Sequence, residues 1–360
     1  MKSLYVACAV CALLFFSANA QKVDLDRAYI KFRYRTLAEK PLDPSFRTYS
    51  IDASLVPTAS RLFTKESIAQ NLVLHGWKRL DEGRGHLNVN VVVDELIFNS
   101  TEITQRVDIQ KNKDGKETGR NYYYRINITY EFDASASVKS HTNSVVYSKT
   151  FGGENDRHQW VSDEFDSRYV ANEYLQNNLQ SIRSGLFKER ITETLLTIGK
   201  DLTRLYGYQA VNYDELFWVV GSKKHPEFEV QQAKLNELKE AMAKINANAL
   251  PEDAKTSIEN ILTYFDDITS TYAGDDKGSR KLRYAAYYNR ANLYLILDQP
   301  DLAKTEAARL IANDYDEKDG ERFMKQSDEL KKLFEVNNTL TRHFPIDVNA
   351  FKSPEIAQVD

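Results

Sequence analysis

The sequence contains little cysteine, proline or glycine. Its 360 residues include 2 Cys, 8 Pro and 14 Gly. So few glycines and prolines exclude a collagen-like or low-complexity chain, and 42% hydrophobic residues are enough to build buried cores. Both cysteines, Cys8 and Cys11, lie within the first twenty residues. The rest of the chain has no thiol, which excludes disulfide bonds, a thiolate nucleophile and cysteine-ligated zinc there.

The first twenty residues have the pattern of a secretory signal peptide. Lys2 precedes an apolar run over residues 4–16, and Ala18-Asn19-Ala20 places small residues at the −3 and −1 positions of a cleavage site. The run is shorter than the roughly 20 residues that a membrane-spanning helix needs. We therefore expect cleavage after Ala20 and export of the protein, to a periplasmic or extracellular location.

The chain also lacks an excess of basic residues and the motifs of common enzymes. Its net charge is −4, and no basic stripe offers a surface for nucleic acid. No P-loop, G-x-G-x-x-G, H-E-x-x-H or G-x-S-x-G sequence is present. We predict no catalytic residue, no metal ion and no cofactor, and hence a protein that is not an enzyme.

Alternating apolar and polar residues between positions 29 and 150 predict strands of an antiparallel sheet. The longest run, over residues 122–132, is expected to place Tyr122, Tyr124 and Tyr130 in the core. A helix capped by Thr64 interrupts the strands, and a helical apolar stripe follows over residues 175–205, with a phase change at Ser184-Gly185. We expect an α+β domain, an antiparallel sheet backed by helices, over residues 21–207.

The pattern changes to helices beyond residue 207. A connector over residues 208–228 leads into five segments that we predict to be helices. They cover residues 229–246, 251–272, 279–297, 300–313 and 319–336. Helices that alternate with short turns are typical of helical-repeat domains. We expect such an all-α domain over residues 229–340 and a tail over 341–360.

The third of these segments carries a repeat-like motif. Tyr287, Ala291 and Tyr294, followed by Ala303 in the next segment, resemble the core positions of one tetratricopeptide (TPR) repeat. In that family, small residues let the paired helices approach, and aromatic residues fill the space between them. The resemblance implies a helical domain that docks a partner protein. The sequence departs from the family pattern at Arg290, where leucine is usual, at Ala307, where a larger apolar residue is usual, and at Tyr315, where proline is usual.

Arg290 is the first predicted contact residue. Because it stands where the pattern has a buried leucine, we predict that it reaches the surface and meets a partner, together with Tyr288 and Asn292 on the same face. The alternative is that the Arg290 side chain only extends along the hairpin to water.

The first domain has a resemblance of its own. A helix, Gly76-Trp77, a charged turn over residues 81–85 and a strand from residue 87 are similar to small domains of secreted lipoproteins and outer-membrane assembly factors. This resemblance implies envelope proteins as partners and no catalysis. We therefore predict a non-enzymatic binding or scaffold protein of the bacterial cell envelope.

Two alternative functions remain open. An acidic loop over residues 152–166 has carboxylates and a histidine that could bind a metal ion or transfer protons, as in a metal-dependent hydrolase. Its polar residues are Glu154, Asp156, Arg157, His158, Asp163, Glu164 and Asp166. The second alternative is glycan binding, because some of the 21 tyrosines could form an exposed aromatic surface.

Overall fold

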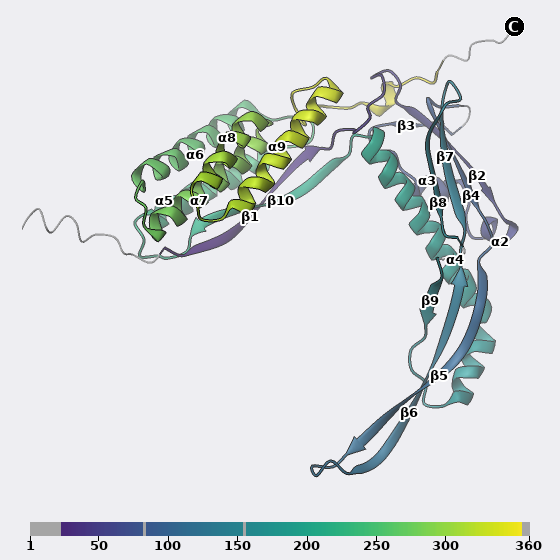
Figure 1. Ribbon diagram of the computed structural model, residues 1–360. Helices are drawn as coiled ribbons and strands as arrows, with labels where there is room; N and C mark the ends of the chain where they lie inside the picture. The colour runs from purple at the N-terminus through teal and green to yellow at the C-terminus, as the bar shows by residue number, and fades with distance from the viewer. Residues whose placement is uncertain (1–22, 82–83, 154–155, 355–360) are drawn as a thin grey trace, which may run out of the picture. The chain divides into compact units, whose positions relative to one another are not determined.

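The computed structural model describes residues 23–81, 84–153 and 156–354, which form two compact units (Figure 1). Unit 1 consists of residues 23–40 and 208–346, and unit 2 of residues 41–207 and 347–354. The predicted signal peptide lies outside the described residues. Strands dominate between residues 25 and 161 and helices between residues 168 and 337. This order confirms the predicted fold class, an α+β domain followed by an all-α helical domain.

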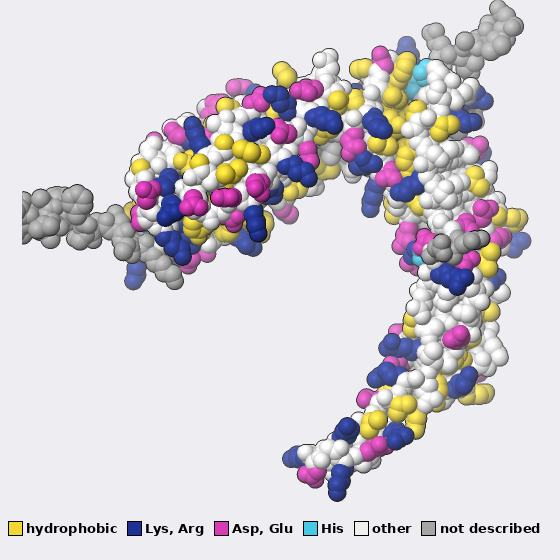
Figure 2. All heavy atoms as spheres, viewed as in Figure 1, with side chains coloured by type: hydrophobic (Ala, Val, Ile, Leu, Met, Phe, Trp, Pro, Cys, Tyr) yellow, Lys and Arg dark blue, Asp and Glu magenta, His cyan; other side chains and the backbone are white. Residues whose placement is uncertain are grey.

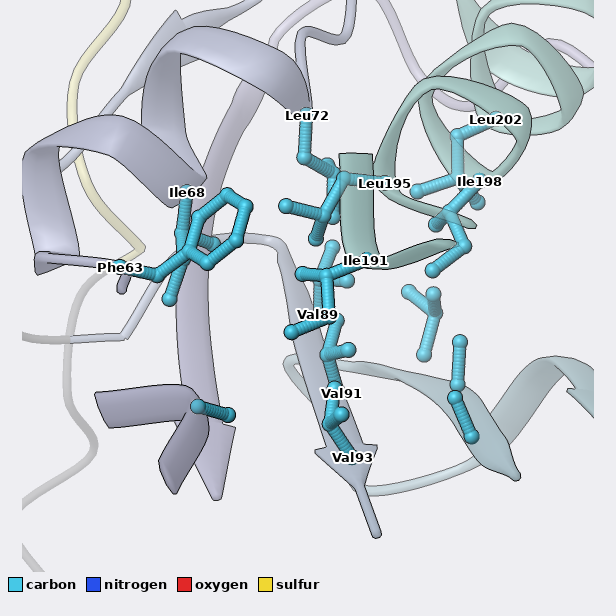
Figure 3. Close-up of a cluster of buried hydrophobic side chains, with 14 of the residues drawn as sticks. Phe63, Ile68, Leu72, Val89, Val91, Val93, Ile191, Leu195, Ile198 and Leu202 are labelled. Atoms are coloured by element: carbon cyan, nitrogen blue, oxygen red, sulfur yellow. The ribbon is translucent and has the colours of Figure 1, made fainter. Parts of the chain in front are cut away.

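The core of unit 2 lies between a five-stranded sheet and two helices. The sheet order is β3-β2-β4-β7-β8, in which β2 is parallel to β3 and β4 and the other pairs are antiparallel. The strands are β2 (Thr48–Leu55), β3 (Lys78–Arg79), β4 (Leu87–Val93), β7 (Ala134–Ser140) and β8 (Val145–Phe151). Figure 3 shows alternate valines of β4 meeting side chains of α3 (Lys65–Asn71) and α4 (Arg168–Tyr206). A short helix, α2 (Pro57–Ser60), precedes α3.

Helix α4 runs without a break through Ser184-Gly185, where its apolar stripe changes phase. Before this point, Leu175 and Leu179 pack on strands of the second sheet of unit 2. After it, Ile191 and Leu195 pack on the five-stranded sheet. The phase change therefore marks a change of packing partner within one helix.

That second sheet contains a long hairpin. Strands β5 (Ile97–Lys111) and β6 (Glu117–Glu131) pair along their length, and β9 (His158–Val161) pairs with β6 over Asn127–Tyr130 only. Tyr122 lies beyond the part of β6 that β9 covers and is 44% exposed, so its predicted burial is wrong. Figure 2 shows hydrophobic side chains among charged ones along this hairpin. The alternation of residue types continues here, although the described residues of this end of the hairpin are mostly exposed.

Unit 1 combines five helices with a two-stranded ribbon. The helices begin and end within three residues of the predicted segments. They are α5 (Glu227–Lys244), α6 (Glu252–Thr271), α7 (Lys277–Ile296), α8 (Pro300–Ala312) and α9 (Glu317–Asn337). Strand β1 (Leu25–Arg35) pairs antiparallel with β10 (Ala210–Val220) along the full length of both strands, and Figure 1 shows this ribbon beside the helices. No helix in the described residues has both the length and the hydrophobicity to cross a membrane.

The ribbon corrects the predicted domain limits. The sequence pattern assigned residues 25–35 to the first domain and residues 208–228 to a connector. In the structure, Phe32 of β1 and Phe217 of β10 share one core with α5, α6 and α7. Two segments far apart in the sequence thus complete the helical unit. Periodicity detects a strand but does not identify a partner so distant along the chain.

The predicted tail is also divided. Phe344 and Ile346 pack against Leu37 and Tyr208 in unit 1. Residues 347–354 belong to unit 2, where the Lys78 ammonium donates to the Phe351 carbonyl at 3.1 Å.

Candidate functional site

The face of α7 that was predicted to bind a partner is covered by β10 of the same chain. The Asn289 side chain accepts a hydrogen bond from the Trp218 N–H at 2.9 Å and donates one to the Trp218 carbonyl at 2.7 Å. Asn292 donates to the Leu216 carbonyl at 2.8 Å. Because residues 216 and 218 alternate along the strand, these amides bind the edge of β10 opposite to β1.

The predicted contact residues are therefore buried. Tyr288, Arg290 and Asn292 are 4%, 7% and 2% exposed. Tyr288 packs edge-on against Trp218, with ring centroids 6.2 Å apart. The prediction that these three residues share an exposed face is wrong, because the strand and neighbouring helices cover all three.

Arg290 is neutralised inside the unit. Its guanidinium pairs with Glu306 of α8 at 3.0 Å and with Asp266 of α6. Arg309 reaches the same Glu306 carboxylate at 2.8 Å. Burial raises the pKa of Glu306, and the charges of Arg290 and Arg309 oppose this shift. The arginine in the leucine position thus belongs to an ion-pair network in which Arg290 and Glu306 are buried.

The four predicted repeat-core residues lie at or near helix contacts. Ala291 and Ala303 have no exposed surface. Tyr287 and Tyr294 are half-buried and pack at the margins of two different hydrophobic clusters. The two alanines thus lie in the interior of the helical unit, and the two tyrosines lie at the edges of hydrophobic clusters. Membership of the tetratricopeptide family stays a prediction.

The acidic loop forms ion pairs across the second sheet of unit 2. Glu164 pairs with Arg106 at 2.9 Å and with Arg125 at 3.1 Å, and Arg157 pairs with Glu131 at 3.1 Å. His158 begins β9. Glu154 lies outside the described residues. Among the residues that the structure describes, no three His, Cys, Asp or Glu side chains come together as a metal site.

The free edge of β2 is a site that the sequence pattern does not identify. Strand β3 pairs only with Thr48 and Tyr49, so residues 50–55 have no strand beside them on that edge in the described chain. The Tyr49 carbonyl accepts a hydrogen bond from the Leu80 N–H at 2.8 Å, and so faces this edge. Because backbone groups alternate sides along a strand, the N–H and C=O groups of residues 51, 53 and 55 face the same way.

A groove of about 440 Å³ runs beside this edge, between β2 and α3. Its apolar lining includes Ile51, Ala53, Leu55, Phe63 and Ile68, and its charged lining includes Lys65, Glu66, Arg79 and Asp81. Arg79 pairs with Asp81 at 2.9 Å and with Glu66 at 3.5 Å. The groove therefore presents an apolar floor and a charged rim, on which Arg79 pairs with Asp81 and Glu66. The alternation over residues 49–55 signals a strand, but the open edge results from the shortness of β3.

Comparison with models of known protein families gives no match, and comparison with curated proteins gives no significant match.

Proposed function

We propose that the protein is an exported, non-enzymatic binding or scaffold protein of the bacterial cell envelope that docks a partner by strand addition to β2. The observation that carries the proposal is the unpaired edge of residues 50–55 beside an apolar groove. In strand addition, backbone hydrogen bonds supply affinity, and pockets for alternate side chains supply specificity.

The edge of β2 lacks the usual protection against pairing. Exposed edge strands are commonly protected by lysine, proline or a bulge. Residues 50–55 read Ser-Ile-Asp-Ala-Ser-Leu and pair with β4 without a register shift, and Asp52 is their one charged residue. The fitting partner is an extended peptide with apolar side chains at alternate positions, which enter the groove over Phe63 and Ile68.

The helical unit does not offer its α7 face for docking, because β10 of the same chain covers this face. We therefore assign docking to unit 2 and a scaffold role to the helices.

The export part of the proposal is supported by the Ala18-Asn19-Ala20 pattern. N-terminal sequencing of the protein recovered from the envelope fraction is expected to begin at Gln21, and an intact Met1 contradicts export with cleavage.

Docking is tested with a photo-crosslinking residue at position 53 and, as a matched control, at position 54. Ala53 lines the groove, whereas its neighbour Ser54 is exposed on the opposite face of β2. In cells that export the protein, we expect position 53 to yield a discrete crosslinked partner and position 54 to yield none. The crosslinked peptide, identified by mass spectrometry, is expected to alternate apolar and polar residues.

The mode of binding is tested with that peptide in synthetic form. Its addition is expected to slow hydrogen exchange of the Ile51, Ala53 and Leu55 amides, which face the edge, and to leave the exchange of Asp52 unchanged. Ala53→Arg is expected to abolish binding, because a long charged chain fills the groove, and Ser54→Arg is expected to retain it. Equal binding by both arginine variants contradicts strand addition at this edge.

A further inference from the structure

A cavity of about 310 Å³ lies in unit 1 between the ribbon and helices α7 and α9. This volume is at the small end of ligand pockets, which span about 300 to 1,000 Å³. Its lining combines three aromatic rings, aliphatic side chains and a few polar groups. They include Phe32, Tyr34, Tyr213, Glu215, Leu330 and Arg342.

Glu215 is the unusual member of this lining. It lies on the face of β10 shared by Tyr213 and Phe217, and it is directly opposite Ile30 of β1. Its carboxylate accepts a hydrogen bond from the Leu216 N–H at 3.2 Å, and no Lys or Arg nitrogen of the described residues lies within 4 Å of it. Burial raises the pKa of Glu215. A carboxylate among apolar groups is costly unless a cation or a donor compensates it.

The nearby cations are already paired with other groups. Arg342 binds Asp298 at 2.6 Å and also donates to the Leu295 carbonyl. Arg322 pairs with Asp319 at 3.3 Å. Burial raises the pKa of Glu215 by more than the Leu216 N–H, Arg322, the Asn292 amide and Arg342 together lower it. The cavity therefore retains an acidic group whose charge its surroundings only partly balance.

The aromatic wall of the cavity already attracts a cation. The rings of Phe32 and Tyr34 are stacked 5.4 Å apart, and Tyr213 meets both edge-on at 6.0 and 6.4 Å. The Arg342 guanidinium lies 4.5 Å from the centre of the Tyr34 ring. Aromatic faces beside a carboxylate are the chemistry that proteins use to bind organic ammonium ions.

We propose that this cavity binds an organic ammonium ion, with Glu215 as its counter-ion and the rings of Phe32, Tyr34 and Tyr213 as its walls. The ammonium group donates hydrogen bonds to the Glu215 carboxylate, and its alkyl part lies against the aromatic rings and Leu330. An organic ammonium group can come from either of two sources, a free amine or the lysine side chain of a peptide. This site is separate from the edge of β2, so its test does not depend on partner docking.

The test titrates the full chain without its signal peptide with n-butylammonium, Nα-acetyl-lysine methylamide and the neutral control n-butanol, and it follows binding by calorimetry. We expect both cations to bind and n-butanol to bind at least about tenfold more weakly. Tighter binding of the lysine derivative identifies a peptide source, and tighter binding of butylammonium identifies a free amine. Equal binding of the alcohol, or no binding of either cation, overturns the proposal.

Two variants assign the effect to one carboxylate. Glu215→Gln keeps the shape and removes the charge, so it is expected to weaken cation binding at least about tenfold. Asp214→Asn changes the neighbouring exposed carboxylate on the opposite face of β10 and is expected to bind as the natural chain does. Binding that survives Glu215→Gln contradicts the proposal.

The pH dependence provides an independent readout. The titratable groups around Glu215 are Tyr34, Tyr213, Tyr288 and Glu329, and the arginines are Arg322 and Arg342. Since the pKa of Glu215 is raised, affinity is expected to fall with acidification at a pH above the ordinary glutamate value of about 4.3. The Glu215→Gln variant is expected to lose this dependence, and its persistence there overturns the assignment.

Discussion

Asn289 of α7 binds both backbone groups of Trp218, accepting from its N–H at 2.9 Å and donating to its carbonyl at 2.7 Å. A carboxamide can replace a neighbouring strand in this way, since it carries an acceptor and a donor side by side. Strand β10 is thus paired with β1 on one edge and with side chains of the helices on the other. The ribbon is an integral part of the helical unit.

Replacement of Asn289 by alanine is expected to lower the free energy of unfolding by about 2–3 kcal/mol. The Asn289 side chain has no exposed surface. Its removal leaves the N–H and the carbonyl of Trp218 without hydrogen-bond partners at a partly buried position. Denaturant unfolding followed by circular dichroism measures the loss. Asn212→Ala, at an exposed position of the same strand, serves as the control and is expected to change stability by less than about 0.5 kcal/mol. Equal stability of the two variants argues against this contact.

The helices of the second half could be predicted because each carries its own signal. An amphipathic stripe is local, so α5 to α9 follow from periodicity within a few residues. The pairing of β1 with β10 is not local, and nothing in either segment identifies the other. The predicted exposure of Arg290 was wrong because its burial depends on ion pairs with Glu306 and Asp266, which lie on two other helices.

The sequence around the cavity residue Glu215 carries a local signal of a buried charge. Residues 211, 213, 215, 217 and 219 read Val-Tyr-Glu-Phe-Val, so a carboxylate interrupts the apolar face of an alternating strand. Such a residue indicates a buried charge that needs a partner. The open edge of β2 had no such signal, because it depends on the length of a different strand.

Replacement of Arg290 by alanine is expected to lower the free energy of unfolding by about 3 kcal/mol at neutral pH, because Glu306 then stays buried with Arg309 alone. The pKa of Glu306 is already raised by burial, and loss of a cation raises it further. A carboxyl group whose pKa is higher in the folded than in the unfolded state destabilises the fold at pH values above its unfolded-state pKa. This destabilisation disappears as the pH falls and the group becomes protonated.

The deficit of Arg290→Ala is therefore expected to shrink as the pH falls from about 7 toward about 4.5. Thermal unfolding at several pH values measures it. Arg309→Ala removes the more exposed partner of Glu306 and is expected to cost less than about 1 kcal/mol. An Arg290→Ala variant as stable as the natural chain at neutral pH contradicts the buried network.

Two glycines of α4 are expected to respond in opposite ways to alanine. Gly185 is exposed, and a Cβ added there meets no atom within 4 Å, so Gly185→Ala is expected to stabilise unit 2 by about 0.5–1 kcal/mol. A Cβ on Gly199 lies 3.1 Å from the Val73 nitrogen and 3.2 Å from its oxygen. Gly199→Ala is expected to destabilise by about 1–3 kcal/mol, because backbone has to move. Opposite shifts in melting temperature check the pair, and a stabilising Gly199→Ala contradicts this close approach.

Strand β1 is expected to complement the rest of unit 1 when supplied as a separate peptide. A fragment of residues 208–346 retains β10 and all five helices but lacks Ile30 and Phe32, two buried side chains of the shared core. We expect this fragment to unfold with low cooperativity and to gain a higher melting temperature when a peptide of residues 23–40 is added. The peptide restores the ladder from Leu25 to Arg35 and covers the apolar face of β10.

Each of the two side chains, Ile30 and Phe32, contributes about 1.5–3 kcal/mol by burial. A peptide with Ile30→Ser and Phe32→Ser is therefore expected to bind at least about a hundredfold more weakly. A peptide with Lys31→Ser, changed at an exposed position between them, provides the control and is expected to bind as the natural peptide does. A fragment that melts cooperatively without the peptide, at the temperature of the whole unit, contradicts the role of the ribbon as part of the helical core.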